Sequence, residues 1–214
     1  MTEIKTFQVG IMPTNSYVIR DIETSAMAIV DPGEYSKEAV GYIKYNGGNL
    51  EMILLTHGHF DHITGVSAYL NEFPNAKVYI GEKDLPSLEN DDLNLSNKFA
   101  SRRFTHFSAD TLKDEDTLTL GNTKIKYMET PGHTMGSGCF IFDQSIMSGD
   151  TLFCESCGRT DFPDSSPASM IKSLLKIASL EGEYNIYPGH MESTTLSHEK
   201  KYNPYMNTSY EDIY

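Results

Sequence analysis

The sequence predicts a mixed α/β fold in which strands and helices alternate along a chain of 214 residues. Three observations support this prediction. Short runs rich in β-branched and apolar residues recur, segments with apolar residues at helical spacing lie between them, and Gly, Pro, Asn and Asp separate the two kinds of run. The length suits one hydrophobic core, so we expect residues 1–214 to form a single domain.

The first half of the chain predicts antiparallel strands and then a strand–turn–helix–strand unit. Asn46-Gly47-Gly48 closes the first expected helix, and Pro74 ends the second. We interpret residues 82–104 as irregular helix or as a segment that crosses the active face. The expected strands are 4–9, 16–20, 27–30, 52–55 and 77–80, and the expected helices are 35–46 and 63–73.

The second half predicts further strands around one well-marked helix. That helix begins at Ser166-Pro167, because Ser is a good N-cap and Pro suits the first helical position. A helix is also expected from residue 192 until Pro204 interrupts it. The expected strands are 123–128, 139–142, 145–147 and 184–187.

Composition excludes several classes of partner. The formal net charge of -13 opposes a nucleic-acid backbone, and no basic stripe offsets it. The first residues lack a basic leader followed by an apolar run, and no apolar run reaches a membrane-spanning length. Three cysteines do not make a disulfide framework. We therefore expect a cytoplasmic protein with no nucleic-acid or membrane partner.

Histidine and aspartate gather where predicted strands end. His57, His59, Asp61 and His62 follow the strand 52–55 within six positions, where a loop can turn several side chains toward one point. A lone Pro-Gly-His or Gly-Asp is usually an ordinary turn, whereas the six-residue cluster is hard to explain that way. His106 and His198 lack such a context, so we expect them at the surface. The strand-end candidates farther along the chain are His133, Asp150 and His190.

These motifs resemble those of the metallo-β-lactamase superfamily. The resemblance rests on Thr56-His57-x-His59-x-Asp61-His62, Thr130-Pro-Gly-His133-Thr, Gly149-Asp150-Thr-Leu-Phe and Tyr187-Pro-Gly-His190. It is closer to the glyoxalase II-like (hydroxyacylglutathione hydrolase-like) members, in a short form without the C-terminal helical domain. The resemblance implies a four-layer αββα sandwich with metals at one edge of the sheets.

The resemblance also implies a division of the ligands between two metals. His57, His59 and His133 would bind the first, Asp61, His62 and His190 the second, and Asp150 would bridge both. Imidazole and carboxylate ligands without thiolate suit two Zn²⁺, although Fe or Mn fit the same set.

A binuclear site of this kind favours hydrolysis. Two cations can share a water, lower its pKa to about 7 and polarise the carbonyl that it attacks. Asp61 is expected to handle a proton as well. The expected substrate is a small thioester, either one like S-lactoylglutathione or one with a related thiol carrier; another ester is also considered. For the assembly, we consider a homodimer.

The segment after Asp150 departs from the classical pattern. Arg159 stands where classical glyoxalase II has a Lys that holds a substrate carboxylate, so we expect it to bind substrate; the alternative is that it pairs with Asp161 or Asp164 to shape the loop. Cys154 and Cys157 form a Cys-x-x-Cys, for which loop packing is the default interpretation and a redox role the alternative.

Two alternative activities remain on the sequence. A persulfide dioxygenase of the same superfamily has a similar motif but binds one iron, with ligands that would correspond to His57, His133 and Asp150. A lactonase or another ester hydrolase of the same fold is the second. A β-lactamase and a nuclease are weaker alternatives, since the chain lacks a leader and is strongly acidic. A non-enzymatic domain would have lost ligands, and none is missing.

Overall fold

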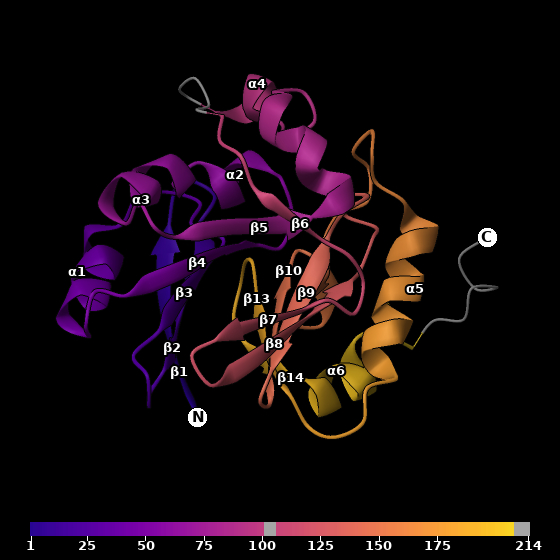
Figure 1. Cartoon of the computed structure of the whole chain (residues 1–214). Coiled ribbons are helices and arrows are strands. Elements are labelled where there is room, and N and C mark those ends of the chain that lie inside the picture. Colours follow the sequence, from indigo (N-terminus) through magenta and orange to yellow (C-terminus); the bar gives the residue numbers. More distant parts are fainter. Residues whose placement is uncertain (101–105, 208–214) are drawn as a thin grey trace.

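Two β-sheets pack face to face, and helices cover the outer face of each (Figure 1). The computed structural model describes residues 1–100 and 106–207. This arrangement confirms the mixed α/β prediction and the αββα layering that the resemblance implied.

The first sheet brings the His-rich turn to one edge. Its six strands lie in the order β1-β2-β3-β4-β5-β6. β1, β2 and β3 pair antiparallel, whereas β3, β4, β5 and β6 pair parallel, so the carboxyl ends of the last four share one edge. The strands are β1 (Thr2–Val9), β2 (Thr14–Asp21), β3 (Met27–Val30), β4 (Leu50–Leu55), β5 (Lys77–Gly81) and β6 (Asp110–Leu112).

The second sheet contributes the other strand-end motifs. Its six strands lie in the order β14-β13-β10-β9-β8-β7. β10 pairs parallel with β13, and β9 pairs antiparallel with both β8 and β10, so β8, β10 and β13 run in the same direction. The strands are β7 (Thr117–Leu120), β8 (Thr123–Glu129), β9 (Gly138–Phe142), β10 (Ser145–Gly149), β13 (Asn185–Pro188) and β14 (Thr194–Thr195).

The helices divide between the two outer faces. α1 and α3 cover the first sheet, α5 and α6 cover the second, and η1 and α4 lie at the top of the view (Figure 1). Ser36 caps α1 by accepting a hydrogen bond from the Ala39 amide, and Ser166 caps α5 in the same way from Ser169, as predicted. The helices are α1 (Lys37–Tyr45), α2 (Phe60–Ile63), α3 (Val66–Glu72), η1 (Glu82–Glu89), α4 (Ser96–Phe99), α5 (Pro167–Ala178) and α6 (Leu196–Tyr202).

Three apolar clusters fill the spaces between the four layers. Side chains alternate across a strand, so Ile53 of β4 packs toward α1 and α3 whereas its neighbour Leu54 packs between the sheets. Met170 and Leu174 of α5 belong to the third cluster, beneath the second sheet. Burial on both faces holds the strands in register and thereby fixes where their ends lie.

Some predicted elements differ from the structure. The helix expected over 63–73 is found as α3, which begins at Val66 and ends at Glu72, while Ile63 belongs to the separate α2. Thr64 and Gly65 lie between these two helices, and the Gly65 amide donates to the Pro32 carbonyl. The helix expected from residue 192 begins only at Leu196, after β14. The irregular helical segment expected over 82–104 is found as η1 and α4 up to Ala100, and residues 101–104 lie outside the described residues. Strands β6 and β7 and the hairpin of β11 (Leu152–Phe153) and β12 (Ser156–Cys157) were not predicted.

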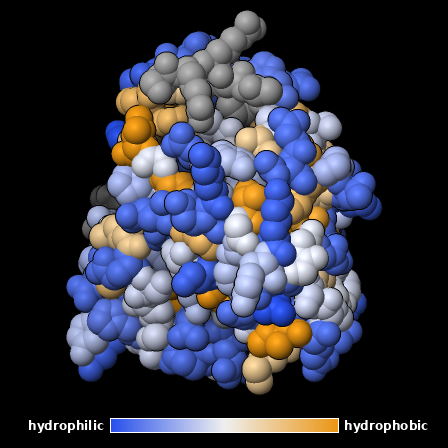
Figure 2. Space-filling view, turned by 90° about the vertical axis from the view of Figure 1, so that its left-hand side faces the viewer, coloured by the Kyte–Doolittle hydropathy of each residue, from blue (hydrophilic) through white to orange (hydrophobic). Residues whose placement is uncertain are grey.

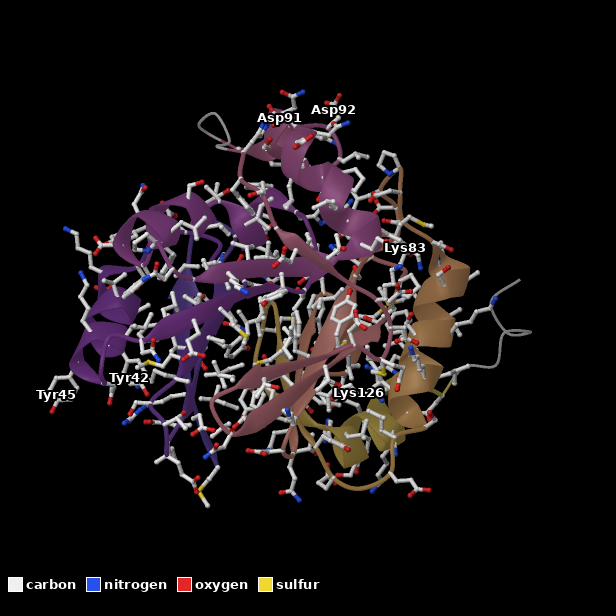
Figure 3. All side chains as sticks on the ribbon, viewed as in Figure 1. Tyr42, Tyr45, Lys83, Asp91, Asp92 and Lys126 are labelled. Atoms are coloured by element: carbon white, nitrogen blue, oxygen red, sulfur yellow. The ribbon has the colours of Figure 1, made fainter. Side chains whose placement is uncertain are left out.

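The surface is mainly hydrophilic on the side of α1 and α3, with small apolar areas between polar side chains (Figure 2). Asp91 and Asp92 project at the top of the view near α4, and Lys83 and Lys126 lie below them (Figure 3). Within the described residues, no helix has both the length and the apolar character needed to cross a bilayer.

Candidate metal centre

All seven predicted ligands meet at the shared edge of the two sheets. Four of them follow β4, with His57 and His59 in the loop and Asp61 and His62 in α2, and the loops after β8, β10 and β13 carry one each. The two Pro-Gly-His turns and the Gly-Asp turn lie at this edge because β8, β10 and β13 run in the same direction. The seven are His57, His59, Asp61, His62, His133, Asp150 and His190.

A first triad consists of His57, His59 and His133, all buried. One ligand atom from each lies within 4.8 Å of the others. His59 Nδ1 is 2.9 Å from His133 Nε2, and the His57 ring centroid lies 4.8 Å from that of His59 and 4.8 Å from that of His133. Three imidazoles this close form a nitrogen-only candidate site.

A second triad consists of Asp61, His62 and His190, whose ligand atoms also lie within 4.8 Å of one another. Asp61 Oδ2 is 3.6 Å from His62 Nε2 and 3.3 Å from His190 Nε2. Thr14 Oγ1 lies 3.3 Å from the same carboxylate oxygen and donates to it. The second triad is therefore mixed, with one carboxylate and two imidazoles.

Asp150 lies between the two triads. Its Oδ2 is 3.5 Å from His133 Nε2 in the first triad, and its Oδ1 is 3.4 Å from His62 Nε2 in the second. Its Oδ2 also lies 3.6 Å from His190 Nε2. Asp150 thus contacts both triads, and a carboxylate in this position can bridge two cations.

The unpaired polar atoms of this centre fit cations. Within the described residues, four buried atoms here lack any hydrogen-bond partner, and each points a lone pair or proton into the cluster: His57 Nε2, His59 Nε2, His62 Nε2 and Asp150 Oδ1. Buried polar atoms without partners are costly, so each calls for an explanation. Divalent cations supply one, because neutral imidazole and carboxylate are their ordinary ligands.

The protonation of the two triads differs. Burial and the neighbouring histidines hold the pKa of His57 well below its usual range, and burial together with His133 lowers the pKa of His59 to about 2. Burial acts in the same direction on His62, but the carboxylates of Asp150, Asp61 and Asp31 outweigh it and raise its pKa to about 10. His57 and His59 are therefore neutral, as metal ligation requires, whereas the carboxylates around His62 favour positive charge there.

Asp31 supports the centre from behind, and the sequence interpretation missed it. It follows β3 at the same sheet edge, is buried, and accepts hydrogen bonds from the Thr56 amide at 2.8 Å and the Thr56 hydroxyl at 2.6 Å. His62 Nδ1 lies 3.0 Å from Asp31 Oδ2, the oxygen that also accepts from the Thr56 hydroxyl. A proton on Nδ1 leaves Nε2 free to face the cluster, so Asp31 sets the tautomer that can ligate a metal.

A second buried carboxylate, Asp84, joins the two loops that carry the first triad. It accepts from the Gly58 amide at 2.8 Å, the Thr134 hydroxyl at 2.8 Å and the Gly136 amide at 2.7 Å. Burial raises its pKa to about 6 despite these hydrogen bonds. Gly58 is required here because a Cβ at this position would overlap the Ser87 hydroxyl.

Arg159 does not face the centre with a free side chain. The Arg159 side chain is 61% exposed. Its guanidinium donates to both carboxylate oxygens of Asp161, at 2.6 and 2.7 Å, and lies 4.6 Å from the centroid of the Phe162 ring. Its main-chain carbonyl accepts from His133 Nδ1 at 2.8 Å. The pairing with Asp161 is the loop-shaping alternative from the sequence, and the substrate-binding role of Arg159 stays a prediction.

A cavity of about 450 Å³ opens onto the centre. Its floor includes His59, Asp61, His133, Asp150 and His190, and Arg159 lies at its wall. Most of its remaining lining is apolar and comes from separate segments: Met12, Phe60, Leu95, Phe99, Phe153, Phe162 and Met191. The centre is thus reached through a largely apolar opening.

The family follows from a comparison of the whole chain. Residues 9–190 match the model of the metallo-beta-lactamase superfamily, and this span contains every residue of the centre. The chain belongs to that superfamily. The ordered His and Asp motifs that lie together in space all fall within the matched span.

Relatives of this metallo-beta-lactamase domain include several hydrolases. A probable metallo-hydrolase from Streptococcus pyogenes serotype M6 is 33% identical over 90% of this chain and 85% of its own length. A probable polyketide biosynthesis zinc-dependent hydrolase from Bacillus subtilis is 31% identical over 86% of this chain and 76% of its own. A hydroxyacylglutathione hydrolase from Francisella tularensis subsp. novicida is 34% identical over 78% of this chain and 60% of its own.

Solved structures agree with this placement. The B3 metallo-beta-lactamase BLEG-1 superposes with a TM-score of 0.88, at 32% identity over 96% of this chain and 100% of its own. TTHA1623, solved in a di-iron-bound form, superposes with a TM-score of 0.82, at 28% identity over 94% of this chain and 100% of its own. The protein is therefore a member of a metallo-hydrolase family with His and Asp clusters suited to a binuclear site.

Proposed function

We propose that the protein is a binuclear metal-dependent thioesterase that acts on thioesters with an apolar group beside the scissile carbonyl. The observation that carries this proposal is the pair of triads joined by Asp150 at the floor of a largely apolar cavity. His57, His59 and His133 would hold one cation and Asp61, His62 and His190 the other. We propose Zn²⁺ for both, since the donors are nitrogen and oxygen, while Fe or Mn would fit the same donors.

The hydrolysis places few demands on the chain beyond positioning. When bound, the cations supply Lewis acidity to a water and to the substrate carbonyl. Asp61 remains ionised, because His62 and His190 lower its pKa more than burial raises it. Its carboxylate lines the cavity and can accept the proton of the attacking water and pass it to the departing thiolate. Thr14 donates to the same carboxylate and holds it in place.

The cavity wall favours an apolar acyl or thiol portion. Phe99, Phe153 and Phe162 offer ring surface, and burying apolar substrate area against them favours binding at about 25 cal/mol per Å². Among the described residues that line the cavity, Arg159 is the sole Lys or Arg, and Asp161 already neutralises it. Glutathione carries two carboxylates and an ammonium group, so it has few matching charges here.

The relatives support the hydrolytic part of this proposal. A metallo-hydrolase and a zinc-dependent hydrolase cover most of the chain, and the hydroxyacylglutathione hydrolase has by its name a thioester substrate. The chain spans 60% of the length of that last relative, so its specificity is carried over only as part of the proposal.

The test measures metal content and two activities on one purified sample. We expect close to two metal ions per chain by elemental analysis, and faster hydrolysis of a hexanoyl thioester of N-acetylcysteamine than of S-lactoylglutathione. Oxygen uptake with a glutathione persulfide is measured in parallel. A single iron with oxygen uptake and no thioester cleavage would refute the proposal in favour of the dioxygenase. Preference for S-lactoylglutathione would refute its apolar specificity alone.

A further inference from the structure

A second cluster of metal-type donors lies away from the catalytic centre. Cys154, His198 and Glu199 each place one ligand atom within 4.8 Å of the others. A sulfur, an imidazole nitrogen and a carboxylate oxygen are the three donor types that zinc takes in proteins. The sequence interpretation expected His198 at the surface and gave loop packing as the default for Cys154, with a redox role together with Cys157 as the alternative, so the two residues were not connected with each other.

The surroundings of this cluster are acidic. Glu199 is fully buried at 0% exposure, and within the described part of the chain neither Lys nor Arg forms an ion pair with it. Its carboxylate accepts from the Thr194 hydroxyl, the Glu155 amide and the Asn203 side-chain amide, so both oxygens have hydrogen-bond donors. None of these three donors carries a formal positive charge, and a cation beside the carboxylate would supply one.

Glu155 adds a further carboxylate beside the imidazole. Its Oε1 lies 2.9 Å from His198 Nε2. Metal-ligating histidines usually have such a carboxylate on one ring nitrogen, which orients the ring and increases its basicity. Burial together with the charges of Glu199, Glu192 and Glu155 raises the pKa of the Cys154 thiol, and a bound cation would act in the opposite direction.

The cluster is close to the geometry of a zinc site without matching it fully. Bond lengths of about 2.0–2.3 Å in a tetrahedron place ligand atoms about 3.5 Å apart. The upper limit of 4.8 Å therefore leaves about 1 Å of side-chain movement. Cys154 and His198 are only partly buried, so rotamer changes of this size displace no packed core.

The position of the cluster links two elements that are separate in sequence. Cys154 and Glu155 form the turn of the β11–β12 hairpin, whereas His198 and Glu199 belong to α6. The neighbouring Phe153 lines the cavity, with its ring centroid 6.1 Å from that of His190. A cross-link at this point would hold the hairpin, and with it one wall of the substrate cavity.

We propose that Cys154, His198 and Glu199 form a separate Zn²⁺ site that fastens the β11–β12 hairpin to α6. Binding forms a sulfur–metal bond and releases the thiol proton of Cys154 to solvent. The third metal is structural, so it adds stability to the folded chain and steadies the Phe153 wall.

Cobalt substitution tests this site apart from the catalytic centre. The predicted catalytic ligands are all imidazoles and carboxylates, so a sulfur-to-cobalt charge-transfer absorption can arise only from a cysteine. The full-length protein, stripped of metal and titrated with Co²⁺, is expected to show this absorption and to bind close to three ions per chain. The result is independent of whether the protein cleaves thioesters.

Matched variants assign the absorption to the cluster. Cys154→Ser and His198→Gln are expected to abolish it and to reduce the metal content by one, while Cys157→Ser retains both. Zn²⁺ at low excess is also expected to raise the thermal midpoint of the wild type more than that of the folded Cys154→Ser variant. Absence of the absorption in the wild type, or its persistence in Cys154→Ser, would overturn the proposal.

Discussion

The hydrogen bond between Asp31 and His62 offers the sharpest test of how the metal centre is built. Asp31→Asn keeps the size of a buried side chain but replaces one carboxylate oxygen by an NH₂ group. Asp31 Oδ1 accepts from the Thr56 amide, and Oδ2 faces both the Thr56 hydroxyl and His62 Nδ1. With nitrogen at the Oδ2 position, His62 Nδ1 must accept instead of donate, so its proton moves to Nε2, the atom that faces Asp61 and Asp150.

The magnitude follows from the contacts that are lost. Partners that orient a metal ligand are typically worth 10–100-fold in metal affinity, which is about 1.4–2.8 kcal/mol. A flipped amide would restore His62 but leave the Thr56 amide without an acceptor, at about 1–3 kcal/mol of folding free energy. Asp31→Asn is therefore expected to weaken binding of the second metal by 10- to 100-fold.

Competition with a chelator measures this loss directly, and Asp21→Asn provides the matched control. Asp21 is also a fully buried aspartate of the first sheet, and it accepts hydrogen bonds from the Thr24 amide, the Asn122 amide and the Thr123 hydroxyl. It lies at the far end of β2 from Thr14, which contacts Asp61; the separation is about 23 Å at a strand rise of about 3.3 Å per residue. Asp21→Asn is expected to lower stability while metal affinity is unchanged.

The outcome that would refute this reasoning is a folded Asp31→Asn protein that binds both metals with wild-type affinity. Equal losses of affinity in Asp31→Asn and Asp21→Asn would also refute it, because they would show that general destabilisation of the sheet is the cause.

Three further predictions concern the loops and the cavity. Gly58→Ala should lower the free energy of unfolding by about 1–3 kcal/mol in urea denaturation, because the added Cβ overlaps Ser87. Adding Ser87→Gly removes the overlap and should recover the lost stability. No recovery in the double variant would contradict the steric explanation. Asp84 binds its proton more tightly in the folded state, with a pKa of about 6 against an unfolded value of 3.8, so its contribution to stability is complete below pH 3.8 and declines as the pH rises toward 6. At fixed metal loading, the difference in unfolding free energy between wild type and Asp84→Asn should therefore shrink as the pH rises across this interval. The change is at most about 3 kcal/mol, because each unit of pKa shift corresponds to about 1.36 kcal/mol. A difference that stays constant with pH would argue against the raised pKa. Phe99→Ala should raise KM for a hexanoyl thioester on the order of tenfold, because about 1.4 kcal/mol of apolar contact with the substrate is lost. The metal content of the variant should be unchanged. An equal rise in KM for acetyl and hexanoyl thioesters would count against an apolar subsite.

The positions of the candidate metal ligands were predictable because their signals are local. His57, His59, Asp61 and His62 fall within six positions after an apolar strand, so one turn of chain already brings them together. The remaining ligands follow strands that run in the same direction, and parallel strands deliver their ends to one edge. Short strands such as β6, and the β11–β12 hairpin, were missed because two or three residues carry no measurable period.

The supporting residues were not predictable for the opposite reason. Asp31 looks like an ordinary turn residue in Asp31-Pro32-Gly33, and only the pairing of β3 with β4 places it behind His62. Asp84 lies in a segment without clear periodicity, yet it joins loops that are far apart in sequence. Contacts between such distant segments depend on the complete packing of both sheets.

The sequence by itself predicted the His-rich cluster after one strand from its local spacing, and the resemblance carried by its motifs predicted the family, the candidate donor set and the edge at which they gather. Tertiary structure alone decided which neighbours each group meets: that Arg159 pairs with Asp161, that aromatic side chains from separate loops line the cavity, and that Cys154 meets His198 and Glu199. The physical reason is that a side chain's partner is the one with the lowest free energy among all those the fold brings within reach, and sequence spacing does not limit that set.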